Sequence, residues 1–273
     1  MYDSLMGGRQ WPFRFQLFVY EPGRRVIGFH LVLDPRSIYR AGIIGGITNV
    51  FASRGIPIIN FAVSLTPFEK NHCVLYVDLS NNEDVDVMDL LSDLKHVPYV
   101  VDVILIKPLF DGFVANPYFF PLIFGDERAV IFLKRGYEGL IKHGRKKLGS
   151  GFDAILYLEG YNLGANTFLR WYKELADKSS ENLLKMAKTL FQQVGYGIIV
   201  IESVNTERAE AIIRIYDNFE CELFRGSDKP ESHLVRGMIA GWFSQFFNKN
   251  VIAIETKCIA KGDPYCEFQI KPK

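Results

Sequence analysis

Near the C-terminal end of the sequence, Glu255, Cys258 and Cys266 have side chains that can hold a metal ion. The turn Gly262-Asp263-Pro264 lies between the two cysteines. Thiolates and a carboxylate around a tight turn can bind zinc, and a close cysteine pair can instead form a disulfide. In a third interpretation the two thiols are reduced and only packed. The residues alone leave all three interpretations open.

The elements around this turn are predicted from hydrophobic periodicity. Residues 251–257 and 265–270 alternate as two strands of a hairpin that closes around the turn. A strongly amphipathic helix is expected before it, from Ser232 to Asn248. Further strands are predicted at 129–133, 154–158, 198–201 and 211–216, with helices at 137–148, 160–178 and 180–194. This interleaving predicts an α+β fold whose short strands pair as an antiparallel sheet.

The first hundred residues show a different order. Alternating apolar residues predict strands at 27–33, 59–65, 73–79 and 101–105, and helical stripes run through 43–51 and 87–94. The resulting order is βαββαβ, the split-βαβ or ferredoxin-like arrangement. Residues 11–20 are expected to add one more strand.

Composition and length exclude several classes of protein. A chain of 273 residues favours two domains, and 32 basic against 31 acidic residues give no nucleic-acid footprint, so no direct nucleic-acid binding is expected. No run of 18 apolar residues predicts a membrane span, and no signal peptide is seen, so we expect a cytoplasmic protein. No nucleotide-binding glycine motif or catalytic constellation is visible, and we therefore expect no enzyme activity.

Residues 41–56 resemble the first helix of an ACT domain. Gly42, Thr48, Gly55 and Ile56 match that family's pattern, whereas Tyr39-Arg40-Ala41 stands where the family has an acidic residue and a proline. The resemblance implies an ACT-like regulatory or dimerisation domain over residues 1–107. An apolar linker rich in proline and phenylalanine is expected over 108–125, and the second domain over 126–273.

The second domain resembles the 4-vinyl reductase (4VR) domain, a ligand-binding module. The resemblance is carried by an opening strand and helix through Gly149, by Gly160-x-x-x-Gly164, by Gly237-x-x-x-Gly241-Trp242, and by the terminal motif from Glu255 to Phe268. Similar domains are α+β sensors of phenol or xylene, predicted hydrocarbon-binding proteins, and trafficking-complex subunits with a lipid channel. The resemblance implies a dimer and an apolar pocket.

Zinc-binding relatives of this family use an early cysteine followed by a Glu, Cys and Cys at the spacing of Glu255, Cys258 and Cys266. At the position of the early cysteine this chain has Ser232. The resemblance therefore implies a zinc site in which Cys221 or His233 is the fourth ligand.

Our leading hypothesis is a cytoplasmic small-molecule sensor that binds an apolar or aromatic ligand, such as an aromatic compound, hydrocarbon or fatty acid. It would act as a homodimer and signal through the ACT-like domain to a separate signalling or DNA-binding partner. The alternatives are a scaffold subunit that holds a structural lipid, and an accessory protein of tetrapyrrole or aromatic metabolism. A leucine at Gly241 is expected to block the ligand and leave the fold intact. The predicted ligand-binding residues are Phe168, Trp171, Tyr172, Met238, Gly241, Trp242 and Phe246.

Overall fold

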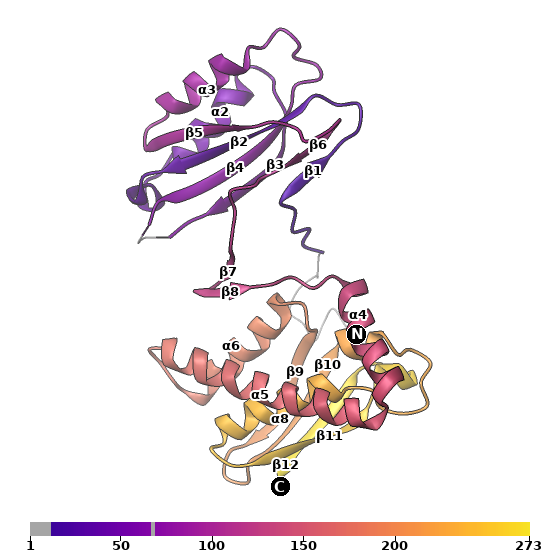
Figure 1. The fold of residues 1–273 in the computed structure, drawn as a ribbon. Coiled ribbons are helices and arrows are strands. Elements are labelled where there is room, and N and C mark those ends of the chain that lie inside the picture. Colours follow the sequence, from indigo (N-terminus) through magenta and orange to yellow (C-terminus); the bar gives the residue numbers. More distant parts are fainter. Residues whose placement is uncertain (1–11, 67–68) are drawn as a thin grey trace. The chain divides into compact units, whose positions relative to one another are not determined.

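The computed structural model describes residues 12–66 and 69–273. The chain forms two compact units, residues 1–130 and 131–273 (Figure 1). Among the described residues, no helix is both long enough and apolar enough to cross a membrane.

The first unit has the predicted βαββαβ order, and its four main strands form one antiparallel sheet in the order β3-β4-β2-β5. Helices α2 and α3 cover one face of this sheet (Figure 1). The side chain of Asp86 caps α3 by accepting a hydrogen bond from the backbone N–H of Met88. The elements are β2 (Val26–Leu33), a short 3₁₀ helix (Pro35–Tyr39), α2 (Ile43–Ala52), β3 (Ile58–Ser64), β4 (Asn71–Asp78), α3 (Val87–His96) and β5 (Val100–Ile106).

The second face of this sheet is covered by two short paired strands, β1 (Phe18–Tyr20) and β6 (Phe113–Ala115). Val19 and Val114 pack there in one buried cluster with Tyr76 of β4. The predicted strand over 11–20 is therefore correct only for its last three residues. Residues 12–16 have no regular structure, and Trp11 lies outside the described residues.

The predicted apolar linker, residues 108–125, contains β6 and also β7 (Leu122–Phe124), which pairs with β8 (Glu127–Ala129). Gly125 forms the turn between β7 and β8 with a positive φ of 67°. The strand predicted over 129–133 is wrong, because only Ala129 belongs to a strand and residues 130–133 have no regular structure. The local pairing of β8 with β7 ends where the chain leaves this hairpin.

The second unit is an α+β fold whose antiparallel sheet has the order β11-β12-β10-β9. The predicted hairpins β9–β10 and β11–β12 are confirmed. Helix α8 packs on the sheet, with Val235, Ile239 and Phe243 in one buried core with Ile213 and Phe268. The elements are α4 (Lys134–Leu148), α5 (Ser150–Glu174), α6 (Ser180–Gln193), β9 (Ile198–Asn205), β10 (Glu210–Tyr216), α7 (Phe219–Glu222), α8 (His233–Phe246), β11 (Val251–Lys257), a 3₁₀ turn (Ile259–Lys261) and β12 (Cys266–Pro272).

The strand predicted at 154–158 is wrong, since these residues form part of the 25-residue helix α5. The backbone of α5 lies directly against that of α8, and glycines on both helices permit this approach. A Cβ added at Gly160 would lie 2.1 Å from the carbonyl oxygen of Leu234, and one at Gly164 would lie 2.0 Å from that of Met238. The helix pair is thus fixed by small residues, as in other close helix crossings.

The glycines of α8 make the reciprocal contacts. A Cβ at Gly237 would lie 2.2 Å from the carbonyl oxygen of Tyr157, and one at Gly241 would lie 2.0 Å from that of Tyr161. A leucine at position 241 would therefore force the two helices apart. The expectation that Gly241→Leu leaves the fold intact is wrong, because the neighbour of Gly241 is rigid backbone.

Candidate functional site

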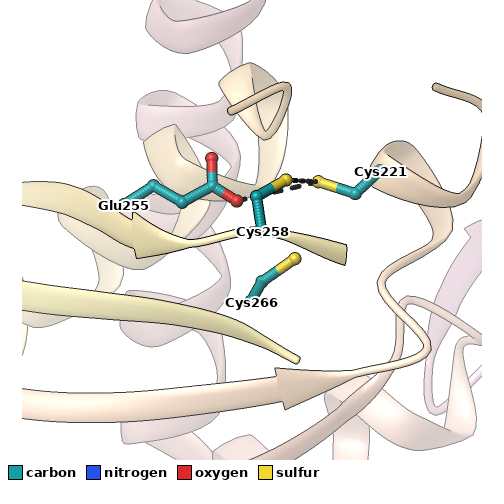
Figure 2. Close-up of side chains that lie close together, drawn as sticks. All are labelled: Cys221, Glu255, Cys258 and Cys266. Carbon is teal, nitrogen blue, oxygen red and sulfur yellow. Dashed lines mark hydrogen bonds between the residues drawn. The ribbon is translucent and has the colours of Figure 1, made fainter. Parts of the chain in front are cut away.

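Three cysteines and one glutamate converge in the second unit. One ligand atom from each of Cys221, Glu255, Cys258 and Cys266 lies within 4.8 Å of all the others (Figure 2). Cys258 Sγ is 3.4 Å from Cys221 Sγ, and Cys221 Sγ is 3.8 Å from a Glu255 carboxylate oxygen. The three thiols are fully buried, and no disulfide links the cysteines that the structure describes.

The β11–β12 hairpin positions two of the cysteines. Gly262 has a φ of 95°, which favours glycine and turns the chain sharply after Cys258. The carboxylate of Asp263 accepts a hydrogen bond of 2.8 Å from the backbone N–H of Cys258. The Gly-Asp pair of the turn therefore fixes Cys258, and Cys266 follows as the first residue of β12.

Helix α7 brings Cys221 to the same place. The side chain of Asn218 accepts hydrogen bonds from the backbone N–H groups of Glu220 and Cys221 and so caps this short helix. Asn218 also donates to the hydroxyl of Ser232 at 2.9 Å, and the Ser232 N–H donates to Glu255 at 3.2 Å. Ser232, which stands at the position of the family's early cysteine, thus supports Glu255, and Cys221 completes the cluster.

His233 does not join the cluster. Its Nε2 lies 3.6 Å from a carboxylate oxygen of Asp153 and 4.0 Å from one of Glu231. Of the two residues that the sequence offered as a fourth ligand, the fold therefore selects Cys221.

Burial and mutual contact shift the protonation of the cluster. Burial raises the pKa of Glu255 to about 9. Hydrogen bonds from the other two thiols lower the pKa of Cys258 to about 2, while the contact with Cys258 raises the pKa of Cys221. Cys258 is thus the preferred thiolate of the group, and its two thiol neighbours share their protons with it.

The donor set and its spacing fit a zinc ion. Tetrahedral zinc with bonds of about 2.3 Å to sulfur requires ligand atoms about 3.8 Å apart. The separations of 3.4 and 3.8 Å between ligand atoms are close to that value. Four protein ligands would close the coordination sphere, which is the pattern of structural rather than catalytic zinc.

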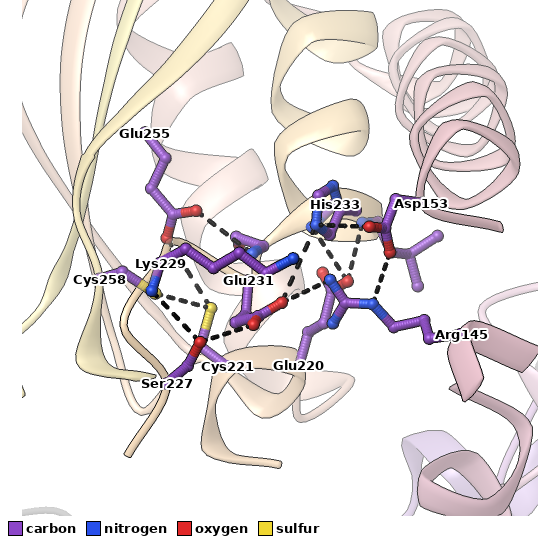
Figure 3. Close-up of polar contacts among 12 residues, drawn as sticks. Arg145, Asp153, Glu220, Cys221, Ser227, Lys229, Glu231, His233, Glu255 and Cys258 are labelled. Atoms are coloured by element: carbon purple, nitrogen blue, oxygen red, sulfur yellow. Dashed lines mark hydrogen bonds and ion pairs between the residues drawn. The ribbon is translucent and has the colours of Figure 1, made fainter. Parts of the chain in front are cut away.

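A buried polar network lies beside the cluster (Figure 3). The carboxylate of Glu220 accepts the backbone N–H groups of His233, Leu234 and Val235 and so caps the N-terminus of α8. Burial raises the pKa of Glu220 to about 7. Because Glu220 precedes Cys221 in α7, the same short helix orders the N-terminus of α8 and the cysteine cluster.

Four of the predicted ligand-binding residues form an aromatic cluster between α5 and α8. Phe168 lies edge-on to Trp242 with ring centroids 5.3 Å apart and stacks on Tyr172 at 5.4 Å. Trp242 stacks on Phe246 at 5.2 Å. The rings of Phe168, Tyr172, Trp242 and Phe246 are called the aromatic cluster below.

The remaining predicted ligand-binding residues have other surroundings. The guanidinium of Arg170 lies 5.2 Å from the ring centroid of Trp171, which has no ring contact with the aromatic cluster. Met238 is buried in the core, and its backbone packs against Gly160 and Gly164. Gly241 faces the backbone of Tyr161. The assignment of these three residues to a ligand site stays a prediction.

Comparison with known proteins identifies the C-terminal part. The sequence model of the vinyl-4-reductase (4VR) domain family matches residues 211–272, which contain α8, the β11–β12 hairpin and all four residues of the cysteine cluster. These residues form a 4VR domain. This is the family that the terminal motif predicted.

Two curated relatives of the 4VR part are uncharacterized proteins of Methanocaldococcus jannaschii. One is 31% identical over 123 residues, which are 45% of this chain and 66% of that protein. Another is 36% identical over 120 residues, 42% of this chain and 50% of that protein. The chain thus spans one half to just under two thirds of the length of these relatives.

One solved structure supports the fold of the 4VR unit. The phenol-responsive sensory domain of the transcription activator PoxR, solved with phenol, is 20% identical. It covers 54% of this chain and 78% of its own, with a TM-score of 0.51. At this level of identity the likeness concerns the fold alone.

Two surface pockets lie away from the aromatic cluster of the 4VR unit. One of about 370 Å³ lies where α4 meets α5, and one of about 290 Å³ lies in the first unit beside β5 and residues 115–118. The first could not be found by sequence reasoning, because its lining residues come from positions up to 89 apart in the chain.

Proposed function

We propose that the second unit, residues 131–273, is a sensory domain that binds an apolar or aromatic small molecule at the aromatic cluster. The observation that carries the proposal is the grouping of four aromatic rings on α5 and α8, the two helices at the centre of the unit. A 4VR domain in this unit and a fold similar to a phenol-responsive sensory domain support it. The proposal assigns no catalysis to the chain.

The physical basis of binding is burial of apolar surface. An aromatic ligand that enters between Phe168 and Trp242 loses its hydration, which favours binding by about 25 cal/mol per Å² of apolar area buried. Offset or edge-on ring contacts add about 0.5–1.5 kcal/mol for each pair. The burial class of Phe168 and its ring contacts make it the central residue of this site.

The cysteine cluster would hold a structural zinc ion. Cys221, Cys258, Cys266 and Glu255 would be its four ligands, and the ion would supply no chemistry beyond neutralising their negative charges. Since these residues belong to α7, β11, β12 and the turn between the two strands, zinc would fasten the hairpin to the loop that precedes α8. The helix that carries Trp242 would thereby gain a fixed start.

The first unit would couple subunits and pass the signal on to a separate partner. Its βαββαβ order and its resemblance to the first helix of ACT domains motivate this part of the proposal. Such a sensor needs no nucleic-acid site of its own.

A fluorescence titration with phenol tests the ligand site. We expect phenol to change the emission of Trp242, and we expect Phe168→Leu to weaken binding by about 10-fold or more, equal to about 1.4 kcal/mol. Phe61→Leu in the first unit is the matched control and should bind as the wild type does. Saturable binding that is the same in wild type and Phe168→Leu would place the ligand elsewhere.

A further inference from the structure

A pocket of about 370 Å³ with an excess of positive charge opens at the junction of α4 and α5. Its lining carries four cationic side chains and two carboxylates, which leaves two positive charges uncompensated. This charge is concentrated in a unit whose chain as a whole has a net charge of +1. The lining residues are Lys142, Arg145, Lys146, Gly149, Ser150, Asp153, Phe224, Lys229 and Glu231.

Both carboxylates of the pocket are already bound by one arginine. Arg145 Nε donates to Asp153 at 2.5 Å, and Arg145 Nη2 donates to Glu231 at 2.5 Å (Figure 3). Glu231 also accepts the hydroxyl proton of Ser227 at 2.7 Å. These contacts use up the negative charge of the pocket, so the lysines are not neutralised by it.

Two lysines are available for a ligand. Lys146 and Lys229 make no ion pair with any residue in the ranges 12–66 and 69–273, whereas Lys142 pairs with Glu138 on the exposed side of α4. Lys146 comes from the last turn of α4, and Lys229 comes from the loop before α8. Two ammonium groups from separate elements thus border the same pocket.

The guanidinium of Arg145 retains one unused donor. The side chain is nine-tenths buried, and Nη1 has no hydrogen-bond partner among the described residues. Phe224 fixes the plane of the group, with the guanidinium carbon 4.3 Å from the ring centroid. A buried N–H without an acceptor is costly, and an anion in this pocket is an acceptor of the right charge.

The N-terminus of α5 adds to the positive potential. Gly149 and Ser150 line the pocket, and no side chain caps this 25-residue helix. The backbone N–H groups of a first helical turn and the helix dipole both favour an anion at this position. Helix end, lysines and buried arginine are three separate features that favour the same kind of ligand.

We propose that this pocket binds a small dianion of the phosphate-monoester class. Lys146, Lys229 and the first turn of α5 would hold the phosphate oxygens, and Arg145 would form the fixed positive wall behind them. The site is independent of the aromatic cluster and of the cysteine cluster, so the chain would respond to an anionic as well as an apolar compound.

Calorimetric titration of the full chain with glycerol phosphate, at constant ionic strength, tests this site. We expect saturable binding, weakened about 10-fold or more in the double variant Lys146→Gln/Lys229→Gln. The control is Lys147→Gln/Lys173→Gln, which removes the same charge from positions outside the pocket lining and should bind within about twofold of the wild type.

Two results would overturn the proposal. One is the absence of saturable binding in the wild type at millimolar glycerol phosphate. The other is equal weakening in both double variants, which would mean that only the overall charge matters.

Discussion

At the scale of single residues, the cysteine cluster depends on Cys221, whose thiol lies 3.4 Å from that of Cys258. We predict about one zinc ion per chain in the wild type and well under about 0.2 in Cys221→Ser, because a serine hydroxyl is a poor zinc ligand. Loss of a structural metal should also lower the melting temperature of the 4VR unit by about 10 °C or more. Elemental analysis and calorimetry of protein purified without chelator measure both effects.

Cys73 is the matched control for this prediction. It is a buried free cysteine of β4 in the first unit and does not belong to the cluster. Cys73→Ser should keep the zinc content of the wild type. Equal zinc contents in Cys221→Ser and Cys73→Ser would contradict the assignment.

A buried histidine pair gives the first unit a dependence on pH. The amide of Asn116 lies 3.2 Å from His30 Nδ1, and His30 Nε2 lies 3.1 Å from His72 Nδ1. An amide that donates to Nδ1 requires the proton of His30 to be on Nε2, from where it is donated to His72. Burial, followed by the proximity of His72, lowers the pKa of His30 below its ordinary value of 6.5.

The sign of the effect follows from proton uptake. As the pH falls below 6.5, the unfolded chain binds a proton at position 30 that the folded chain does not, so the free energy of unfolding decreases. We predict that acidification from pH 7 to pH 5 destabilises β2 more in the wild type than in His30→Gln. Hydrogen exchange of peptides from β2 measures this difference. His96→Gln, on the exposed side of α3, should behave as the wild type, and an equal pH response of His30→Gln would contradict the prediction.

At the scale of elements, the pair α5–α8 depends on glycine. We predict that Gly164→Ala destabilises the second unit by about 2–3 kcal/mol, because the new methyl group would meet the Met238 carbonyl at 2.0 Å and force the helices to shift. Chemical denaturation followed by circular dichroism measures the change.

A glycine of α4 provides the comparison. A Cβ added at Gly139 meets no atom within 4 Å, so Gly139→Ala should stabilise the helix by about 1 kcal/mol. If both substitutions change stability in the same direction, the close approach of α5 and α8 does not limit the fold.

The same pair shows what sequence reasoning could and could not find. The β11–β12 hairpin was predictable, because Glu255, Cys258 and Cys266 lie within twelve residues around one turn. The helical state of residues 154–158 was missed, since a short apolar run fits a buried strand and a buried helix equally well. The glycines at 160 and 164 were noticed as a motif, but their contact with α8 is a tertiary feature.

Cys221 and Lys229 illustrate the same limit at long range. The sequence offered both Cys221 and His233 as a fourth ligand, because their spacing does not reveal which side chain turns toward Glu255. The cap of α7 by Asn218 decides this in the folded chain. Lys229 is 83 residues from Lys146, so no local pattern could have joined them in one pocket.

At the scale of the whole molecule, we predict a homodimer in solution. Phe110, Phe120 and Ile123 of the segment after β5 are each more than half exposed, and the first sheet ends in the edge strands β3 and β5. Exposed apolar side chains and open sheet edges are usually covered by association. Light scattering should give twice the chain mass of 31.2 kDa, and a mass near 31.2 kDa at micromolar concentration would contradict the prediction.

The two-unit organisation was accessible from the sequence because each unit has its own hydrophobic periodicity and its own core. The order βαββαβ follows from residues 26–106 alone. The extent of the segment between the units was less accessible, since β6 and β7 make contacts that their composition does not specify.

The central claim is that the 4VR unit binds an exchangeable apolar or aromatic molecule. Native mass spectrometry of the full chain, before and after dialysis against millimolar phenol, tests it most directly. We predict a bound small molecule that phenol displaces, or a new phenol adduct of one per chain, with the adduct lost in Phe168→Leu. A lipid that phenol does not displace, or the absence of any bound compound in both samples, would contradict the claim.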